Sequence, residues 1–507
     1  MPKYTFDLKK QNVLNTIRSP KIYAFNLAQN MALLSSDPAI IRHFYQVEAG
    51  KLLSDEWLAV SVKNRFMAQA IDGQAFSYFG ICPMIVQGKV NLLASNGFKC
   101  QSRNKEIDKK LNRFIEDADM ANKFAQGVYY ESGYGDFLYR LSYDPTVSDK
   151  PLIDVVHASQ FEVSFVKGHV KSYIIKRAAT DDENYELREI YYKNDDGFVC
   201  IMYRFFHDGK YVDPEDTALV KECMLHFGKD IDLKERVLPF KEFPIEFKKN
   251  SNSNMLYQGE RGVPDIQGLD TIEDALTETL SDLIDAIRKG GVKEYVSDEM
   301  IPSDAEGNEL KLNHFNKTII TTKGSANPAN PRSLWQVTQA DIKWEAYTKT
   351  IQNLMSIAIN KAGLSPTTLG LTGLESINSS AESQEAREKT SLRTRELCLA
   401  GWKKTLKSLL NKYLQMLDYI QGQEILDYSE LIEIQFDDYI SPSVENVTDV
   451  LAQQVAAGLK SQKHAIKDLN DGYTDEDADN ELLDIMSEHG APVLQGGSPD
   501  ADVDNGE

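Results

Sequence analysis

The second half of the chain spaces its apolar residues three and four positions apart, which is the pattern of long amphipathic helices. This spacing predicts helices over residues 263–290, 338–362 and 381–420. Arg288 and Lys289 would lie in the last turn of the first helix and complement the negative end of its dipole. At 1.5 Å per residue the three helices are roughly 35 to 60 Å long. Helices of this length are typical of an elongated body or of a subunit in an assembly.

The third of these helices carries an apolar heptad. Its members are Leu392, Leu399, Leu406, Tyr413 and Ile420, accompanied by Trp402, Leu409 and Met416. Two interpretations are open: the stripe packs in the core of its own subunit, which is the commoner case, or it forms a seam between subunits. The basic cluster Lys403, Lys404 and Lys407 on the same helix also has two interpretations, either facing solvent or touching phosphate.

The first half of the chain predicts a sheet in the middle of the sequence. Helical periodicity over residues 105–131 gives way to residues 137–247, which are rich in Val, Ile, Tyr and Phe and are cut by glycine-containing turns. Within them, residues 190–212 predict a meander of antiparallel strands joined at Asp-Gly turns. The expected fold class is therefore α+β, with a mixed domain built on an antiparallel sheet beside long helices.

The elements become short after the third helix. Residues 431–436, with the sequence LIEIQF, predict a returning strand. Ser443, Ser461 and Thr474 are candidate N-caps of three short helices within residues 441–487. Residues 488–507 are rich in Gly, Pro and Asp and are expected to form a disordered acidic tail.

The net charge is acidic and unevenly placed. It is −21 over 507 residues, and residues 421–507 hold 21 Asp and Glu against three Lys. Tight nucleic-acid binding needs clustered Lys and Arg, so the composition argues against a strong grip on phosphate through this region. The composition is compatible with contact with DNA that must stay mobile.

Cysteine spacing and hydropathy indicate the cellular compartment in which the protein is made. The five cysteines form no CxxC pair, so neither a zinc site nor a disulfide framework is predicted; they are Cys82, Cys100, Cys200, Cys223 and Cys398. Such usage suits a reducing cytoplasm. The N-terminal residues lack the apolar run of a signal peptide, and no run of 18 apolar residues occurs. We expect a soluble protein, intracellular when made, without membrane contact.

Motifs for catalysis or cofactor binding are missing from the sequence. There is no GxxxxGK[ST], HExxH or GxSxG. Asp475, Asp477 and Asp479 alternate as in a calcium loop, but Asn480 replaces the required glycine and Met486 the required glutamate. A solvated acidic first turn of a helix is the better interpretation. We expect no enzymatic activity, no metal and no cofactor.

The order of these parts resembles the portal proteins of tailed bacteriophages, in particular the head-to-tail connector of the long-tailed type. The resemblance covers about residues 40–487 and is strongest in the second half. There a long helix, a small αβ insertion, a helix running back, a Gly/Ser/Thr loop and a very long helix follow one another. The stretches SSAESQEAREKTSLRTRE and WKKTLKSLLNKYL are similar to the long helix of that family.

The resemblance implies a division into named parts. These are an N-terminal segment (1–55), an α+β wing (56–262), a first stem helix (263–290), an αβ clip (291–337), a second stem helix (338–362), a tunnel loop (363–380), a long tunnel helix (381–420), a returning wing strand (421–440), a helical crown (441–487) and the tail (488–507).

The resemblance also implies an assembly and its partners. Members form a homo-oligomer, a dodecamer, at one capsid vertex of the virion, assembled in the host cytoplasm. Double-stranded DNA is packaged and ejected through the central channel without sequence specificity. The implied protein partners are the terminase large subunit, head-completion or adaptor proteins, the major capsid protein and scaffolding protein.

The tunnel loop is the segment that the resemblance places around the duplex. Its candidate DNA-facing residues are small or uncharged: Thr367, Thr368, Leu369, Gly370, Leu371, Thr372, Gly373, Ser376 and Asn378. Such residues permit close approach without neutralising phosphates, and glycines permit backbone changes.

Two further sets of candidates follow from position. Carboxylates of the first stem helix would repel phosphates from a channel wall or else face outward toward the capsid: Glu273, Asp274, Glu278, Asp282 and Asp285. Candidate clip contacts to terminase or adaptor are Lys323, Asn327 and Arg332. Two other function classes stay open, a helical scaffold or adaptor without a channel and an intracellular α+β enzyme.

Overall fold

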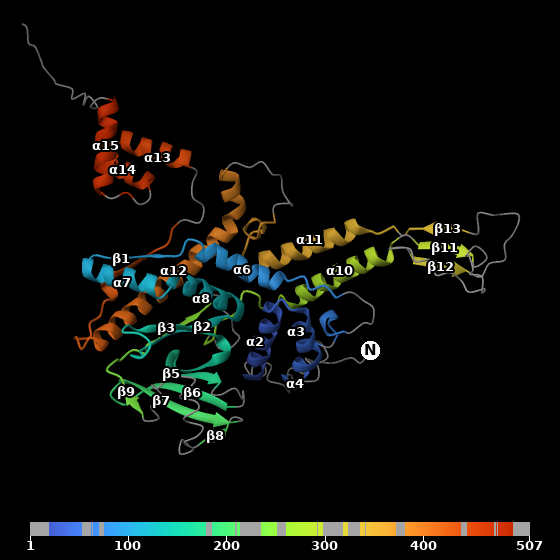
Figure 1. Cartoon of the computed structure of the whole chain (residues 1–507), viewed down its shortest axis with the longest axis horizontal. Coiled ribbons are helices and arrows are strands. Elements are labelled where there is room, and N and C mark those ends of the chain that lie inside the picture. The colour runs from blue at the N-terminus through green and yellow to red at the C-terminus, as the bar shows by residue number, and fades with distance from the viewer. Residues whose placement is uncertain are drawn as a thin grey trace, which may run out of the picture. The chain divides into compact units, whose positions relative to one another are not determined.

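The computed structural model describes residues 20–52, 62, 64–69, 76–178, 185–207, 210–212, 235–250, 260–291, 293–297, 318–322, 335–339, 341–371, 381–437, 444–470, 473 and 475–489. The chain divides into two compact units. One consists of Met1–Ile377 with Arg387–Tyr439, the other of Asn378–Ala386 with Ile440–Glu507. Helices and mainly antiparallel sheets both contribute (Figure 1), so the predicted α+β class is confirmed.

Most of the described helices belong to the first unit, and of the long helix α12 only the first six residues belong to the second. They are α2 (Pro20–Leu34), α3 (Pro38–His43), the π-helix η1 (Phe44–Glu48), α4 (Ala49–Leu52), the 3₁₀ turn η2 (Phe66–Ala68), α6 (Ile81–Ala94), α7 (Lys105–Asp117), α8 (Met120–Tyr134), the 3₁₀ turn η3 (Ala158–Gln160), α10 (Asp270–Lys289), α11 (Trp344–Lys361), the 3₁₀ turn η7 (Pro366–Leu369), α12 (Ala381–Ile420) and the 3₁₀ turn η9 (Ser429–Leu431).

The described strands form four sheets, all in the first unit. They are β1 (Lys99–Ser102), β2 (Asp136–Ser142), β3 (Leu152–Val156), β4 (Phe161–Val166), β5 (His169–Ala178), β6 (Tyr185–Lys193), β7 (Val199–His207), β8 (Lys210–Val212), β9 (Arg236–Val237), β10 (Ile245–Lys249), β11 (Lys293–Ser297), β12 (Thr318–Thr322), β13 (Trp335–Thr338) and β14 (Ile432–Gln435).

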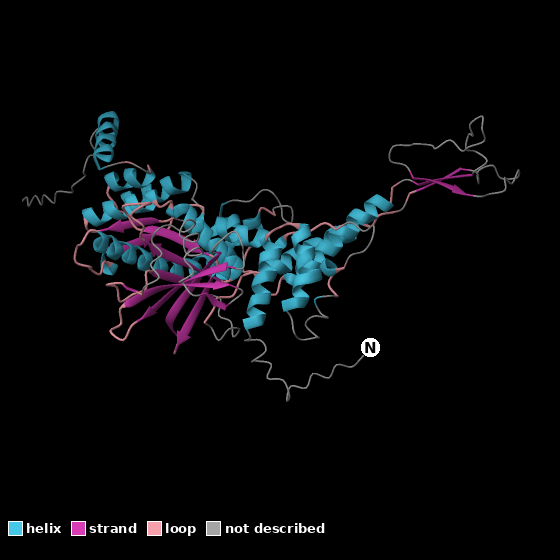
Figure 2. Cartoon of the chain, turned by 60° about the horizontal axis from the view of Figure 1, so that its bottom comes forward, coloured by secondary structure: helices cyan, strands magenta, loops and turns pink. Residues whose placement is uncertain are grey.

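The largest sheet has the order β4-β5-β6-β7-β8, and β9 also pairs with β7. Every pairing in it is antiparallel, and β6, β7 and β8 are the meander predicted for residues 190–212. Gly168 and Gly197 lie in the connecting turns with φ of 80° and 82°, a conformation that favours glycine. Figure 2 shows these strands in magenta. The other sheets are β10-β2-β3, β1-β14 and β12-β11-β13.

The apolar heptad of α12 packs inside its own subunit. Leu399, Leu406 and Tyr413 of the heptad are buried, and Trp402 is completely buried. The indole of Trp402 lies edge-on to Phe124 at 4.8 Å between ring centroids. The core interpretation is therefore the observed one, because this stripe covers the small sheet and α8. Lys403 and Lys404 are exposed, as the solvent-facing interpretation predicts.

A second core lies around α6. Ile81, Ile85 and Val86 of α6 are fully buried there together with residues of α2, α10 and α11. Helices from early and late parts of the first unit's sequence therefore pack on α6. Residues 81–94 have few polar positions, so this helix must be covered on most of its sides.

Three predicted boundaries differ from the structure. The helical pattern of residues 105–131 contains two helices, α7 and α8, because Asp119 has φ of 50° and interrupts the helical backbone. The first stem helix begins at Asp270 instead of 263, since Gly268 has φ of 71° and the chain before it is buried in turns. The second begins at Trp344 instead of 338; β13 and a short link precede it.

The described part of the second unit consists of the first residues of α12 and three further helices. They are α13 (Val444–Ala456), α14 (Gln462–Leu469) and α15 (Asp475–His489), which match the three predicted helices. Ser461 caps α14, as predicted, with its hydroxyl accepting from the His464 amide. Helix α15 runs past residue 487 to His489, so the predicted tail begins too early; residues 490–507 lie outside the described residues.

His157 links the small sheet to the large one and should make the fold sensitive to acid. Burial lowers the pKa of His157 to about 4. Its ring packs on Tyr130 and Tyr134, and its Nδ1 atom accepts from the Ser159 amide. A neutral imidazole is therefore required, so its stabilising contribution is complete above an ordinary pKa of about 6.5 and is lost as pH falls toward 4.

We expect His157→Asn, which keeps an acceptor for the Ser159 amide, to reduce this acid sensitivity. Between pH 7.5 and pH 5 the wild-type protein should lose about 2 kcal/mol more of its unfolding free energy than the variant. Urea unfolding of both proteins at the two pH values measures the difference. Equal losses would show that His157 does not carry the effect.

Candidate functional site: a helical hairpin and its connector

Helices α10 and α11 pack side by side as a helical hairpin, and the sheet β12-β11-β13 lies between them in sequence (Figure 1). Arg288 and Lys289 occupy the last turn of α10 and complement the helix dipole as predicted. Asp270 and Glu273 occupy the first turn, where negative charge is also favourable. The Lys361 ammonium donates to the Gly268 carbonyl at 2.8 Å, which fixes the end of α11 to the start of α10.

One face of α10 is hydrogen-bonded to the chain that leads into α6. The Glu273 carboxylate accepts from the amides of Gly80 and Cys82 at 2.8 and 2.9 Å. Further along, the hydroxyls of Thr277 and Ser281 accept from the amides of residues 79 and 77. Gly80, at the N-cap of α6, has no side chain that could accept these hydrogen bonds. Glu273, which is distant in sequence, therefore takes the role of the N-cap side chain.

Asp274 also serves the interior of the subunit. Its carboxylate accepts from the amides of Phe66 and Met67 at 3.0 and 2.9 Å. The neighbouring Asp270 forms an ion pair with Arg65. Helix α10 therefore carries a row of acceptors that orders the residues before α6.

These contacts correct part of the predicted acidic channel wall. Glu273 is fully buried, and burial raises its pKa although the amides it accepts from lower it. Asp274 is committed to backbone amides, and Asp285 is buried with Lys289 at 3.6 Å. A wall needs carboxylates that face solvent, so these three do not fit that role.

Glu278 and Asp282 differ from the other predicted wall residues. Glu278 is exposed and Asp282 is half-buried. Burial raises the pKa of Glu278, and the like charges of Asp274 and Asp282 raise it further. Glu278 is thus the carboxylate of the set that presents its charge most openly.

The residues after α11 fold onto α6 and α12, and we call residues 363–371 the connector. Gly363 ends α11 with φ of 70°, and its carbonyl accepts from the Thr394 hydroxyl at 2.6 Å. The Ser391 hydroxyl accepts from the Ser365 amide at 2.8 Å and lies 2.7 Å from the Thr368 hydroxyl. The connector is therefore held on α12 by hydroxyl hydrogen bonds.

An apolar contact holds the same connector on α6. A Cβ atom on Gly88 would lie 2.1 Å from the Leu369 Cδ2 atom, so any larger residue there would displace the end of the Leu369 side chain. Leu371 packs against the second core as well. Thr368, Leu369 and Leu371, which were predicted to face DNA, are half-buried and make the contacts that hold the connector down.

The remaining tunnel-loop candidates divide in two. Thr367 and Gly370 belong to the described residues. Gly370 ends η7 with φ of 72°, and no other atom lies within 4 Å of a Cβ added there. Thr372, Gly373, Ser376 and Asn378 lie outside the described residues, as do the clip candidates Lys323, Asn327 and Arg332.

Helix α6 contacts the hairpin, the connector and α12. The Lys89 ammonium pairs with the Asp265 carboxylate at 2.5 Å, and both side chains are 3% exposed. Asp265 belongs to the turns that precede α10, and its carboxylate also accepts from the Asn250 amide at 2.9 Å. At the other end of α6, the Arg395 guanidinium of α12 donates to the Leu92 carbonyl at 3.1 Å.

The sequence contained few signs of this arrangement. One was available: an apolar helix at residues 81–94 without Ser, Thr, Asp or Asn immediately before it needs an acceptor from elsewhere. Nothing local identified Glu273 as that acceptor.

The hairpin, connector and α12 all lie within residues 79–489, which match a family model described as "Phage portal protein, SPP1 Gp6-like". The chain belongs to this phage portal protein family. The resemblance inferred from the order of elements is thereby confirmed, and the role as a portal or connector protein follows at the level of the family. No curated protein matches the chain.

Two solved structures resemble this portal protein at low similarity. A chain of "Virion of native gene transfer agent (GTA) particle" has 13% identity and a TM-score of 0.37, covering 80% of this chain and 96% of its own. A chain of "Neck of native GTA particle computed with C12 symmetry" has 13% identity and a TM-score of 0.37, covering 78% of this chain and 92% of its own.

Two features are missing from the described residues of this portal protein. No group of three or more His, Cys, Asp or Glu side chains in this part of the chain is placed to hold a metal ion. None of its described helices is both long enough and apolar enough to cross a membrane.

Proposed function

We propose that this portal protein forms a closed dodecameric ring at one capsid vertex, whose channel passes double-stranded DNA during packaging and ejection. The observation that carries the proposal is the family match over residues 79–489, which includes the hairpin, the connector and α12. The protein acts as a structural conduit in the virion and not as an enzyme.

Exposed apolar side chains on the hairpin support assembly with further copies. Ile287 of α10 is 55% exposed, and Trp344 and Ile357 of α11 are 58% and 55% exposed. Large apolar side chains in water are costly, and neighbouring copies in a ring would cover them. In this assignment the hairpin is the stem, and β11, β12 and β13 belong to the clip.

The partners follow from the position of each part in the ring. The clip docks the terminase large subunit during packaging and head-completion or adaptor proteins afterwards, with Lys323, Asn327 and Arg332 as proposed contacts. The wing faces the major capsid protein and scaffolding protein, and the crown is formed by α13, α14 and α15. Assembly takes place in the host cytoplasm.

The tunnel loop is proposed to begin after the connector, at residue 372. Residues 372–380 contain one charged residue, Glu375, and are otherwise small, polar or apolar. DNA that moves through a ring must not be held in one register, and affinity grows with each phosphate that a cation neutralises. A lip without cations around the duplex therefore permits passage, with Thr372, Gly373, Ser376 and Asn378 nearest to it.

Glu278 and Asp282 are the carboxylates that we retain for an acidic channel wall. Negative charge on the wall repels phosphates and prevents binding to the stem. The charge of the chain, −21, has the sign that this role requires.

Electron microscopy of the purified protein tests the proposal. We expect rings with a central hole wide enough for a DNA duplex, and class averages with twelvefold symmetry. Compact or filamentous particles without a hole, over a range of protein and salt concentrations, would contradict the ring and favour a scaffold or adaptor without a channel.

A further inference from the structure

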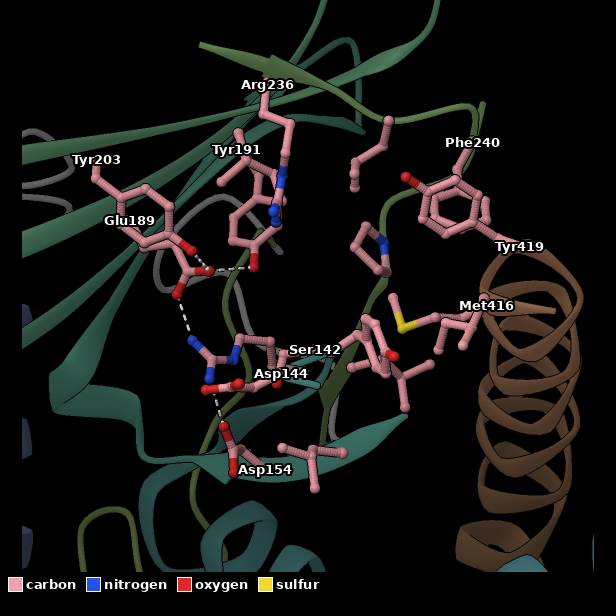
Figure 3. Close-up of a pocket in the computed structure, with 18 of the residues that line it drawn as sticks. Ser142, Asp144, Asp154, Glu189, Tyr191, Tyr203, Arg236, Phe240, Met416 and Tyr419 are labelled. Carbon is pink, nitrogen blue, oxygen red and sulfur yellow. Dashed lines mark hydrogen bonds and ion pairs between the residues drawn. The ribbon is translucent and has the colours of Figure 1, made fainter. Parts of the chain in front are cut away.

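A cavity of about 530 Å³ lies in the α+β body and has no role in the proposed channel. It is formed by β2 and β3 of the small sheet, β5, β6 and β7 of the large sheet, residues 236–244 and the last turns of α12 (Figure 3). Its volume falls in the range of ligand-binding cavities, roughly 300 to 1,000 Å³.

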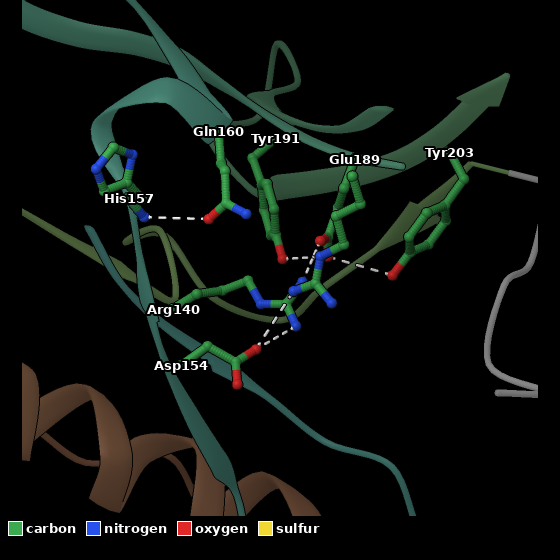
Figure 4. A network of polar contacts seen from close by, with 8 residues as sticks. Arg140, Asp154, His157, Gln160, Glu189, Tyr191 and Tyr203 are labelled. Carbon is green, nitrogen blue, oxygen red and sulfur yellow. Dashed lines mark hydrogen bonds and ion pairs between the residues drawn. The ribbon is translucent and has the colours of Figure 1, made fainter. Parts of the chain in front are cut away.

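One side of the cavity is a network of charges that neutralise one another. The Arg140 guanidinium donates to Glu189 and, at 2.6 Å, to Asp154, as Figure 4 shows. The hydroxyls of Tyr191 and Tyr203 donate to the same Glu189 carboxylate at 2.5 and 3.3 Å. Both carboxylates are therefore satisfied and do not call for a cationic ligand.

Two guanidinium groups at the cavity keep unused donors. Arg140 is only 8% exposed, and its Nε atom is buried without a hydrogen-bond partner. Arg236 extends from β9 over Tyr191 (Figure 3), and no ion pair joins it to a carboxylate among the described residues. The lining carboxylate of Asp144 instead accepts from the amide and hydroxyl of Thr146. The Arg140 Nε atom is too deeply buried to meet a ligand, so the donors that the cavity presents are those of the exposed Arg236, and they favour an anionic group.

The opposite side of the cavity is apolar. The rings of Phe240 and Tyr419 meet edge to face at 5.5 Å between centroids, and Met416 and Ile420 continue this wall along α12. Tyr419 is 45% exposed, and Val147, which also lines the cavity, is 69% exposed. Apolar surface thus extends from inside the cavity to its rim, where a partner can reach it.

We propose that this cavity is a docking site for a polypeptide segment that carries one large apolar side chain beside a carboxylate. The apolar side chain would occupy the wall of Phe240, Met416 and Ile420, and the carboxylate would meet Arg236. A polypeptide fits better than a small metabolite because the apolar rim continues outside the cavity, where flanking residues of a chain would be covered.

Three labelled peptides of one length test this chemistry on the full-length protein. They are acetyl-Gly-Asp-Phe-Asp-Gly-amide, the same peptide with Lys for both Asp, and the same peptide with Ala for Phe. Fluorescence anisotropy should show the Asp-Phe-Asp peptide binding at least tenfold more tightly than either of the others. Equal affinities for the three would overturn the proposal.

Two variants at the mouth of the cavity locate the binding. Arg236→Ala should weaken the Asp-Phe-Asp peptide at least fivefold, and Val147→Trp should block entry; both positions are exposed, so folding is preserved. Lys171→Ala, an exposed cation on β5 away from the cavity, should leave binding unchanged. Peptide binding that ignores both mouth variants would overturn the assignment to this cavity.

The small aromatic anion 1-anilinonaphthalene-8-sulfonate separates a peptide site from a small-molecule site. Both ligands should bind and compete. Binding of the dye that depends on Arg236, without peptide binding, would show a site for small anions and overturn docking of a polypeptide. Particle images of the same samples report ring formation separately, so this test does not depend on the proposed channel.

Discussion

Replacing Lys89 by alanine should lower the free energy of unfolding by about 3 to 5 kcal/mol, since removal of one partner from a buried ion pair leaves the other charge uncompensated. Burial by itself lowers the pKa of Lys89, but surrounding charges, Asp265 foremost, raise it overall. The ammonium is therefore charged in the folded protein at neutral pH, and Asp265 depends on it.

Urea unfolding of Lys89→Ala measures this loss, with Lys105→Ala as the control. Lys105 is exposed on α7, so its replacement should change the free energy of unfolding by less than about 0.5 kcal/mol. The double variant Lys89→Met with Asp265→Asn removes both charges and should recover at least half of the loss. A double variant as unstable as Lys89→Ala would show that the pair is not what stabilises this joint.

The position of this ion pair explains why its loss should reach the hairpin. Asp265 lies in the turns before α10, and its amide donates to the Ser132 carbonyl of α8 at 2.8 Å. Lys89 lies on α6 next to Gly88, which receives Leu369 of the connector. Two adjacent residues of α6 therefore fix both ends of the hairpin region to the body.

Replacing Gly370 by valine should reduce DNA packaging at least tenfold while ring assembly continues. Gly370 has φ of 72°, where a non-glycine residue costs about 1–2 kcal/mol. The strain would change the direction in which the chain leaves the connector for the proposed tunnel loop. Packaging into capsids that contain the variant, with particle images as the assembly control, measures the effect.

Gly422→Val is a matched control for this experiment. Gly422 has φ of 67° and follows the end of α12. As at Gly370, no other atom lies within 4 Å of a Cβ added there. Both variants should lose similar stability, and only Gly370→Val should lose packaging. Equal packaging by the two variants would count against a role of this loop in the channel.

The sequence determined the elements whose pattern is local. The bounds of α12, Ala381–Ile420, equal the predicted range, and the meander of β6, β7 and β8 follows its Asp-Gly turns. Helical and strand periods are read over a few residues, and backbone hydrogen bonds in helices and hairpins join residues that are close in sequence. The order of these elements was also sufficient to indicate the portal family.

The tertiary structure alone decided which side chains of the candidate site are available. Glu273 and Glu278 are both acidic residues of α10, yet the first is buried against the Gly80 amide, 193 positions away in sequence, and the second is exposed. Leu369 lies in a segment whose sequence predicts a free loop, but its side chain packs against Gly88 of α6. Burial depends on which distant segments meet, and that is set by packing of the whole chain, which no local pattern records.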